Sequence, residues 1–346
     1  MKRTRPARGS DDEVHLMVRC AELYYYGQRT QAEVALELGI TRLRVNQLLR
    51  RARDEGIVRI AVVDPRRTTA DVATALATRF GLREAVVVRS SAMDANAVAI
   101  DLARAAAEWL RGRLSGPSVV GIGWGQAVAT TVRHLAVNPQ PSRHAEAWAV
   151  PLLGALGDSR PEFRSNDLAR DFAAAFLGQW QPLDLPFLVE RPEVREALLR
   201  DRVMQPVMAL WERLDLAIVG IGYSIARSPL LRTPYFDKSD IMEMERLGIV
   251  GDVLSRFFDA QGAVPPLPFY SRLIGIDLSL LRRGPVVVGI AGGLEKTASI
   301  LGALRGRHVD VLVTDERTAR AILEEPGVLP ATSPNRPAGT SAVDGR

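Results

Sequence analysis

The chain's most chemically distinctive stretch, GITRLRVNQLLRRAR, begins at Gly39 and holds five arginines and no acidic residue. Arg42, Asn46 and Gln47 are residue types that pair with base edges: arginine with guanine, and asparagine or glutamine with adenine. Leu43 is apolar on the same predicted face, where it suits a thymine methyl group. The stretch therefore indicates a contact with the major groove of DNA.

Basic charge is concentrated at this end of the chain. Residues 1–60 contain 12 Lys and Arg against 8 Asp and Glu, a balance of +4, so only +1 of the net charge of +5 falls on the other 286 residues. Arg50, Arg51 and Arg53 follow the base-contacting positions and suit phosphate groups, which position a protein on DNA. The alternative is a solvated basic helix in an ordinary three-helix domain.

A helix-turn-helix is the element that must position these side chains. Helical spacing predicts a first helix over residues 12–25, and the pair Thr30 and Glu33 forms a capping box for a short second helix. Gly39 permits a tight turn, and Thr41 caps a third helix that Gly56 ends. The predicted DNA contacts are Thr30, Gln31, Thr41, Arg42, Leu43, Asn46, Gln47, Arg50 and Arg51.

A second kind of chemistry is indicated by three glycine-rich stretches that each follow an apolar run: residues 120–126, 218–224 and 288–296. Glycine lets a backbone approach a ligand, and a following helix N-terminus offers N–H groups to an anion. Lys296, one of three lysines, follows Gly292 and Gly293. It suits a phosphate or carboxylate contact, or is a solvated lysine in a first helical turn, where it opposes the helix dipole.

An α/β sheet is the element that brings these stretches together. Near-continuous apolar strands that alternate with helices predict a doubly wound, mostly parallel, Rossmann-like sheet, in which ligands bind at the carboxyl ends of strands. The predicted strands are 84–88, 118–123, 145–152, 214–220, 285–290 and 309–314. The predicted helices are 97–114, 168–177, 193–210 and 294–304.

The domain organisation follows from these elements. We expect a disordered basic arm over residues 1–11 and the helix-turn-helix domain over 12–63, with a strand at 57–63. A linker occupies 64–70, and 71–326 form a domain for effector binding and oligomerisation. The tail 327–346 is rich in Pro, Gly, Ser and Thr and is expected to be disordered.

Composition excludes several classes of protein. No apolar run reaches the roughly 20 residues that a membrane helix needs, and no apolar segment of signal-peptide type follows the basic start. The single cysteine, Cys20, excludes an intramolecular disulfide and fits a reducing cytoplasm. Four scattered histidines show no spacing of metal ligands. We therefore expect a cytoplasmic protein without a metal, a cofactor or a membrane contact.

The N-terminal motifs resemble those of one known family. The matching residues are Tyr24-Tyr25, Thr30-Gln31, Ala35, residues 38–42, Val45, residues 48–53 and residues 55–60. In them the N-terminal part is similar to the DNA-binding domain of the SorC family of sugar-responsive transcriptional regulators. That family commonly has proline at the position of Leu43 and arginine at the position of Gln47. Both departures lie on the predicted base-contacting face, so a target sequence does not transfer from relatives.

The resemblance continues through most of the chain. It is carried by residues 121–125, 215–222, 250–253, 256–262, 291–296 and 312–316. It implies an effector domain similar to sugar-phosphate isomerases of the glucosamine-6-phosphate deaminase and ribose-5-phosphate isomerase kind, in a dimeric or tetrameric protein. It implies a pocket for a sugar, polyol or sugar phosphate formed by Gly123, Trp124, Gly125, Gln126, Asp252, Gly292, Gly293 and Lys296.

Two features of the implied pocket stay open. Asp252 accepts hydrogen bonds from sugar hydroxyls or only caps a helix. Relatives that bind a phosphate usually place Thr or Ser directly after the first glycine loop, whereas here Gln126-Ala127 stand there and the hydroxyls of Thr130 and Thr131 come a turn later. Arg160 or Arg164 offers an alternative anion contact.

We interpret the chain as a one-component transcriptional regulator that binds double-stranded operator DNA and a carbohydrate effector, without catalytic residues. The main alternative is an enzyme, a sugar-phosphate isomerase fused to a DNA-binding domain. A third is a sigma-like or architectural DNA-binding protein without an effector, which does not account for the glycine-rich strand ends.

Overall fold

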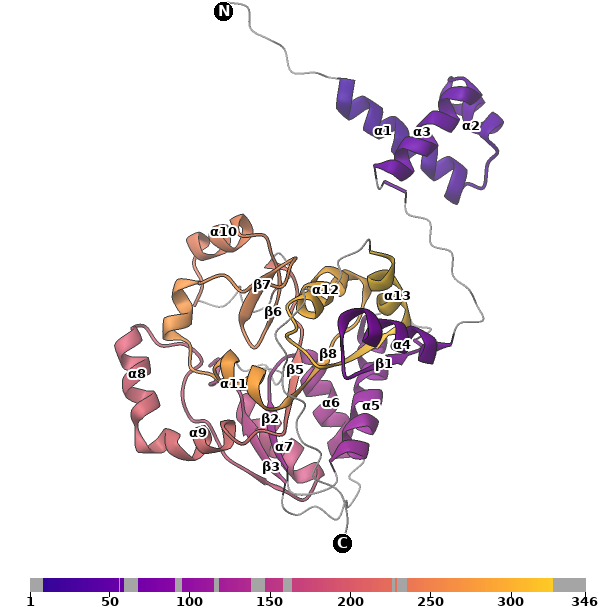
Figure 1. The fold of residues 1–346 in the computed structure, drawn as a ribbon. Coiled ribbons are helices and arrows are strands. Elements are labelled where there is room, and N and C mark those ends of the chain that lie inside the picture. Colours follow the sequence, from indigo (N-terminus) through magenta and orange to yellow (C-terminus); the bar gives the residue numbers. More distant parts are fainter. Residues whose placement is uncertain are drawn as a thin grey trace, which may run out of the picture. The chain divides into compact units, whose positions relative to one another are not determined.

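The computed structural model describes residues 9–55, 57–58, 68–90, 95–114, 118–137, 147–157, 164–225, 228 and 235–325. The chain divides into two compact units, Met1–Pro65 and Arg66–Arg346. The smaller unit is a cluster of helices, and the larger one is built around a sheet (Figure 1). Each unit is described by itself.

Three helices form the N-terminal unit, as the sequence predicts. They are α1 (Gly9–Ala21), which continues as a π-helical turn over Glu22–Tyr26, α2 (Gln31–Leu38) and α3 (Arg42–Asp54). Met17 and Cys20 of α1 are fully buried together with Val34, Val45 and Leu48. Helix α1 begins three residues earlier than expected, so residues 9–11 are helical and not part of an arm; residues 1–8 lie outside the described chain.

Local chemistry explains the turn between α2 and α3. The Thr30 side chain accepts from the Glu33 amide, and the Glu33 carboxylate accepts from the Thr30 amide, which confirms the predicted capping box. Gly39 ends α2 in the left-handed region at φ 65°, where a side chain would be strained. Thr41 then caps α3 by accepting from the Arg44 amide. The helix-turn-helix is thus specified by residues within it.

The segment between the two units differs from its prediction at its far end. Helix α4 (Thr69–Phe80) starts with a capping box between Thr68 and Asp71, so residues 69 and 70 are helical and not part of the linker. Ile57 and Val58 lie in a bend. The rest of the strand predicted over residues 57–63, most of the linker, the helix stop at Gly56 and the tail 327–346 lie outside the described residues.

A seven-stranded sheet forms the centre of the second unit, and every strand pair in it is parallel. The strand order is β1-β9-β8-β5-β2-β3-β4, which confirms the predicted parallel α/β sheet. The strands are β1 (Glu84–Val88), β2 (Val119–Ile122), β3 (Trp148–Pro151), β4 (Gln179–Trp180), β5 (Leu216–Gly220), β8 (Val286–Ile290) and β9 (Val311–Asp315).

Helices cover this sheet in two groups. Helices α5 (Ala95–Arg113), α6 (Gln126–Val137) and α7 (Ser165–Ala175) pack side by side, and α4, α12 (Thr297–Arg305) and α13 (Glu316–Glu324) form a second group (Figure 1). Shorter helices complete the unit: α8 (Pro192–Arg200), α9 (Gln205–Trp211), α10 (Lys238–Arg246) and α11 (Leu278–Arg283). The two helical layers leave the inner strands β2, β5, β8 and β9 almost fully buried, which explains their apolar runs.

The single helix predicted over residues 193–210 is wrong, because the chain interrupts it. Helix α8 ends at Arg200, a 3-10 turn covers Arg202–Met204, and α9 follows. The Asp201 side chain accepts from the Val203 amide and so caps the 3-10 turn. Pro206 has no N–H to donate within a helix, which fits its place in the first turn of α9.

The order of the strands reverses at the middle of the sheet. From β2 the chain moves outward to β3 and β4, whereas from β5 it moves in the other direction to β8 and β9. Strands β2 and β5 are neighbours, so their carboxyl ends form a topological switch point. A two-stranded antiparallel hairpin, β6 (Ile249–Val253) and β7 (Arg256–Asp259), is the only described strand pair outside the sheet.

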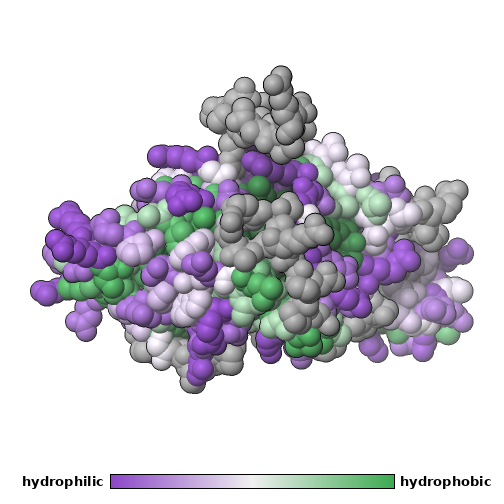
Figure 2. Space-filling model, turned by 90° about the horizontal axis from the view of Figure 1, so that it is seen from below, coloured by the Kyte–Doolittle hydropathy of each residue, from purple (hydrophilic) through white to green (hydrophobic). Residues whose placement is uncertain are grey.

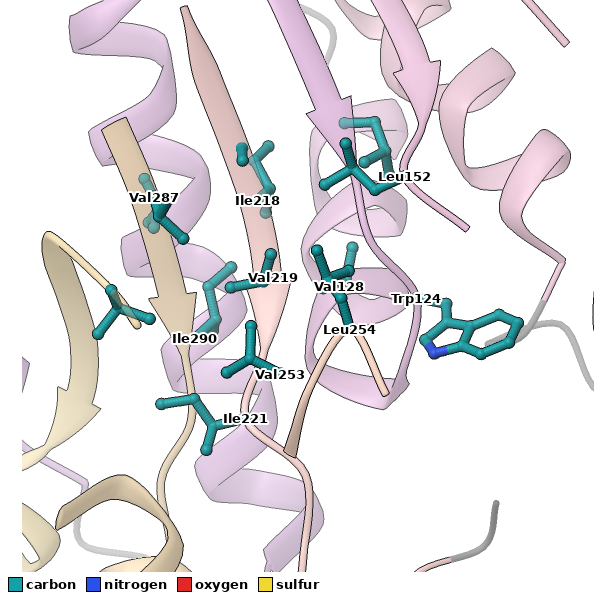
Figure 3. Close-up of a cluster of buried hydrophobic side chains, with 14 of the residues drawn as sticks. Trp124, Val128, Leu152, Ile218, Val219, Ile221, Val253, Leu254, Val287 and Ile290 are labelled. Carbon is teal, nitrogen blue, oxygen red and sulfur yellow. The ribbon is translucent and has the colours of Figure 1, made fainter. Parts of the chain in front are cut away.

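Apolar side chains from these elements fill the space below the switch point. Figure 3 shows Ile218 and Val219 of β5 beside Ile290 of β8, with Val253 and Leu254 of the hairpin next to them. All five are buried. The surface seen in Figure 2 instead intersperses hydrophilic with hydrophobic residues. The carboxyl ends of β2, β5 and β8 therefore rest on a continuous core that fixes the loops following them.

Candidate functional site: a pocket at the switch point and a basic recognition helix

A cavity of about 170 Å³ opens at the carboxyl ends of β2, β5 and β8. The loop after each of these strands forms part of its wall, and α5 and the β6–β7 hairpin supply the rest. The three glycine-rich stretches predicted from the sequence meet here. The lining residues are Asn96, Ala99, Leu102, Trp124, Gly125, Gln126, Ala127, Gly220, Ile221, Gly222, Tyr223, Ser228, Asp252, Leu254, Ala291, Gly292, Glu295 and Lys296.

Asp252 comes from the hairpin and places its carboxylate in the pocket wall. One carboxylate oxygen accepts from the Ser255 amide at 3.0 Å, so the side chain is held by its own hairpin turn and caps no long helix. Burial raises the pKa of Asp252 to about 6, against the lowering effects of the Ser255 hydrogen bond and of Lys296. The carboxylate is thus a hydrogen-bond acceptor whose charge depends on pH near neutrality.

Gly222 makes room for this carboxylate. A Cβ built on Gly222 would lie 1.8 Å from Oδ1 of Asp252, far inside any real contact. The Gly222 amide also donates to the Asp252 carbonyl at 2.8 Å, which fastens the loop after β5 to the hairpin. Glycine at this position is therefore explained by the close approach of Asp252.

Lys296 ends a 3-10 turn over Leu294–Lys296 that precedes α12, and does not lie in the first turn of an α-helix that starts at residue 294 as predicted. Its ammonium donates to the Ile221 carbonyl at 2.8 Å and stands 4.2 Å from the ring centroid of Tyr223. Burial lowers the pKa of Lys296 to about 8, while Asp252 and Glu295 oppose that shift. Lys296 thus connects the loops after β8 and β5, and part of its hydrogen-bonding capacity is already used.

Six of the residues expected in the pocket lie in its wall, and the other two, Gly123 and Gly293, do not. Gly123 is buried and donates to the Ile218 carbonyl at 2.8 Å, so it stabilises the end of β2. The Gly293 amide donates to Asp315 and to Thr318, at 2.8 and 2.9 Å, so it is satisfied within the protein. The six in the wall are Trp124, Gly125, Gln126, Asp252, Gly292 and Lys296.

Trp124 contributes mainly to packing. Only 7% of its surface is exposed, and its ring lies 4.8 Å from that of Phe187 between centroids. Figure 3 shows Trp124 at the edge of the buried cluster formed below the pocket. It therefore supports the loop after β2 and presents little surface to a ligand.

The sequence-based prediction missed the contribution of α5 and most of the loop after β5. Asn96, Ala99 and Leu102 follow helical spacing on α5, and nothing in their types distinguishes them from any other helix face. Tyr223 lies within the second glycine-rich stretch and Ser228 follows it, and the sequence predicts this stretch as a strand end without placing its residues in the pocket. The neighbouring Gly220 and Gly222 were the sequence feature that could have indicated that this loop lines the pocket.

The alternative anion contacts receive little support. Arg160 lies outside the described residues, and Arg164 forms an ion pair with Asp167 at 3.6 Å. The hydroxyls of Thr130 and Thr131 donate to the Gln126 and Ala127 carbonyls one turn earlier, at 2.8 and 2.9 Å. Their hydroxyl protons are thus used within α6.

The recognition helix α3 presents the predicted side chains to solvent. Arg42, Asn46, Gln47 and Arg50 are exposed, and Leu43 keeps 70% of its surface accessible although it is apolar. The opposite face of α3 forms the core of the unit. Thr30 and Thr41 are exposed but use their side-chain oxygens as helix caps, and Gln31 is half-buried. The helix therefore has one buried face and one face suited to a groove.

Arg51 differs from the other predicted contacts. It forms ion pairs with Glu13 of α1 at 2.9 Å and with Glu55 at 2.8 Å, and Glu13 also pairs with Arg44. These arginines lower the pKa of the Glu13 carboxyl, and the two glutamates raise that of Arg51. Arg51 thus ties α3 to α1, a structural role that the sequence did not indicate.

No group of three or more His, Cys, Asp and Glu side chains in the part of the chain that the structure describes is arranged to hold a metal ion. Among the described helices, none has the length and apolar character needed to cross a membrane.

Comparison with known proteins agrees with this architecture. Residues 64–324 match the family described as "Putative sugar-binding domain", and residues 19–55 match sigma-70 region 4. The chain is 31% identical to the sorbitol operon regulator of Klebsiella pneumoniae over 316 residues, which cover 91% of this chain and 99% of that protein. It is 32% identical over 314 residues to the deoxyribonucleoside regulator of Bacillus subtilis, covering 91% and 99%.

Solved structures give the same result. The full-length crystal structure of the sorbitol operon regulator SorC from Klebsiella pneumoniae superposes with a TM-score of 0.68, covering 91% of this chain and all of that one. A helix-turn-helix unit joined to a parallel α/β unit with a pocket at its switch point defines a sugar-responsive, DNA-binding transcriptional regulator. The chain belongs to the SorC family of these regulators, as its motifs predict.

Proposed function

We propose that the pocket at the switch point binds a polyhydroxylated effector, a sugar, a polyol or one of their phosphates, and that this binding changes the affinity of α3 for operator DNA. The observation that carries the proposal is the convergence of Asp252, Gln126 and Asn96 in one cavity. A carboxylate accepts from hydroxyls, and side-chain amides both donate and accept. Such a mixed set suits adjacent hydroxyl groups of a carbohydrate.

Roles in the pocket follow from the geometry of each residue. Asp252 accepts hydrogen bonds from hydroxyl groups of the effector. The Ser255 amide donates to one of its carboxylate oxygens and so holds the carboxylate in the pocket wall. Lys296 fixes the loop after β5 through Ile221 and offers its remaining N–H groups to an oxygen of the effector. Lys296→Ala is then expected to weaken effector affinity about 10- to 150-fold, the equivalent of about 1.5–3 kcal/mol for a charge-assisted hydrogen bond.

Roles on the DNA follow from exposure. Arg42, Leu43, Asn46 and Gln47 lie at the exposed start of α3, the part of a recognition helix that enters the major groove. Arg50 lies further along and suits phosphate contacts. A helix-turn-helix protein commonly recognises two half-sites as a dimer, so we propose a dimeric or tetrameric assembly that works on chromosomal DNA in the cytoplasm.

Regulation requires that the effector distinguishes two arrangements of the protein. A ligand that binds the DNA-competent and DNA-incompetent arrangements equally shifts neither. The cavity wall is built from loops of three strands, a helix and a hairpin, so an occupant that contacts several of these elements favours one arrangement of them. The proposal covers both an effector that releases the protein from DNA and an effector that promotes DNA binding.

The test begins with a thermal-shift screen of sugars, polyols and their phosphates, because binding to the folded state raises apparent stability. A compound that raises the melting temperature is then added to the protein on an operator selected from random DNA, with fluorescence anisotropy as the readout. Asp252→Asn is expected to abolish the response, whereas Glu212→Gln, an exposed carboxylate outside the pocket, retains it. A response that persists in Asp252→Asn contradicts the proposed pocket.

A second candidate function has one observation in its favour. Asp252, with its pKa raised to about 6, and Lys296, with its pKa lowered to about 8, line one cavity, and such a pair suits acid–base chemistry on a sugar phosphate. The relatives are named as regulators. Turnover of aldose or ketose phosphates by the purified protein, lost in Asp252→Asn, would favour an isomerase.

A further inference from the structure

A second depression of about 480 Å³ lies between α5 and α6 and adjoins the pocket. The two helices run side by side on one layer of the sheet (Figure 1). Asn96, Ala99 and Gln126 line both the pocket and this depression, so the two are continuous. We call it the α5–α6 groove. Its other lining residues are Ile100, Ala103, Thr130, Arg133, His134 and Val137.

Charge separates the groove from the pocket. The pocket wall contains two carboxylates, Asp252 and Glu295, against one ammonium, Lys296. That ammonium already donates to the Ile221 carbonyl and faces the Tyr223 ring. The groove, as far as the described residues define it, is lined by a guanidinium and an imidazole and by no carboxylate. An anionic substituent is therefore disfavoured in the pocket and favoured in the groove.

Arg133 is the residue that makes the groove a candidate anion site. Its guanidinium donates to the Ala129 carbonyl at 3.3 Å and to the Thr130 hydroxyl at 3.1 Å, which holds it along α6. No described carboxylate forms an ion pair with Arg133, whereas Arg104 on the neighbouring helix pairs with Asp101 at 2.8 Å. Arg133 thus presents a full positive charge, with N–H groups remaining for an acceptor.

Helical spacing places the groove at the right distance from the pocket. Gln126, Thr130, Arg133 and His134 recur on one face of α6, and Arg133 lies seven residues beyond Gln126. At 1.5 Å per residue this is roughly 10 Å along the helix axis, and a long arginine side chain spans part of that distance. A small sugar at Gln126 with a phosphate at its end reaches the guanidinium.

We propose that the α5–α6 groove is the subsite for a phosphate group carried by the effector, with Arg133 as its ligand and Thr130 and His134 beside it. Arginine binds phosphate through two parallel N–H bonds, which its planar guanidinium supplies in a fixed geometry. The inference rests on the proposed function, because it takes the sugar part of the same molecule to occupy the pocket. It names a sugar phosphate as the class of effector.

The first experiment uses inorganic phosphate and pyrophosphate as probes, so it needs no knowledge of the sugar. The full-length protein is titrated with each anion and followed by ³¹P NMR line broadening and by calorimetry. The wild type is expected to bind saturably, and Arg133→Gln to bind about tenfold more weakly, as the loss of one charge-assisted hydrogen bond predicts. Arg104→Gln, which removes an exposed arginine of α5 outside the groove, is the matched control and is expected to bind as the wild type.

A second experiment compares each sugar with its own phosphate, for example D-ribose with D-ribose 5-phosphate and D-glucose with D-glucose 6-phosphate, in thermal shift. For each sugar that binds, the phosphate is expected to raise the melting temperature further than the sugar alone. Arg133→Gln is expected to lose this additional rise and to keep the rise that the unphosphorylated sugar causes. Circular dichroism checks that the Arg133→Gln protein is folded. Thr130→Val, a smaller change in the same groove, is expected to reduce the additional rise in melting temperature only in part.

Three results overturn the proposal. They are no saturable phosphate binding by the wild type, equal binding by Arg133→Gln, and binding that is lost in Lys296→Met but kept in Arg133→Gln. A change of oligomeric state in Arg133→Gln without phosphate binding by the wild type would assign the groove to a second copy of the chain instead. Sugar binding without phosphate binding leaves the proposed function intact, whereas phosphate binding without any sugar response refutes the sugar pocket and not the anion site.

Discussion

Replacing Gly222 by alanine tests the pocket most directly, because the structure provides a matched control two residues away. The new Cβ would stand 1.8 Å from Oδ1 of Asp252, about half of the roughly 3.3 Å at which carbon and oxygen meet. Asp252 must therefore move. A Cβ at Gly220, which also lines the pocket, meets only the Trp124 carbonyl at 3.6 Å, an ordinary contact. The two substitutions add the same methyl group at positions two residues apart, one at the end of β5 and one in the loop after it.

The magnitude follows from what Asp252 loses. Moving its carboxylate removes the hydrogen bond from the Ser255 amide at 3.0 Å, and crowding of a packed site costs about 1–3 kcal/mol. If Asp252 also binds effector hydroxyls, affinity falls by about 1.5–3 kcal/mol, or about 10- to 150-fold. Gly220→Ala is expected to change the free energy of unfolding and the effector affinity by less than about 0.5 kcal/mol.

Two assays separate stability from binding. Urea unfolding gives the change in stability without any ligand, and calorimetry with the compound found by thermal shift gives the affinity. A Gly222→Ala protein with the same unfolding midpoint as Gly220→Ala would refute the steric argument. Lower stability with unchanged effector affinity would leave the packing argument standing and remove Asp252 from the binding site.

Three further predictions concern the DNA contacts and pH. Asn46→Ala and Gln47→Ala are expected to weaken operator binding by about 1–3 kcal/mol and leave binding to random DNA nearly unchanged; equal losses in gel-shift titrations on both would make them phosphate contacts. Arg50→Ala is expected to lower the slope of log K against log salt by about one unit without loss of stability, whereas Arg51→Ala also lowers the unfolding midpoint, because Arg51 binds Glu13 and Glu55. The pKa of Asp252 rises on folding from 3.8 to about 6, so the native state binds more protons in that interval and stability falls as pH rises through it. Asp252→Asn should remove this component from unfolding curves measured between pH 4 and pH 6; an unchanged pH profile would show that the group titrates normally.

The helix-turn-helix was predictable because its determinants are local. Thr30 with Glu33, Gly39 and Thr41 specify caps and a turn within a dozen residues, and the structure has each of them as expected. The ion pair of Arg51 with Glu13 was not predictable, because it joins α3 to a helix that lies nearly 40 residues earlier in the chain. An arginine that ties two helices has the same sequence pattern as one that faces DNA.

The sequence predicted a parallel α/β sheet, but it could not predict the order of the strands in that sheet. Apolar runs such as those of β5 and β8 indicate buried parallel strands, but no pattern within a strand states which strand pairs with it. Gly292 and Gly222 gave an indication of the pocket through their glycine-rich context. Asp252 had to be supplied by family resemblance, since it comes from a hairpin outside the sheet, and α5 gave no indication at all.

The pairing of β1 with β9 has a consequence for the order of events during synthesis. Glu84 at the start of β1 pairs with Val311 of β9, the last strand among the described residues, and Arg79 of α4 donates to the carbonyls of Leu323 and Glu325. One edge of the sheet therefore stays open until β9, more than 220 residues after β1, has left the ribosome, whereas α1, α2 and α3 are complete after some fifty residues. The nascent protein thus carries a finished DNA-binding unit long before it has a closed ligand-binding one, and the long loop that β1 must close predicts slow folding of the second unit.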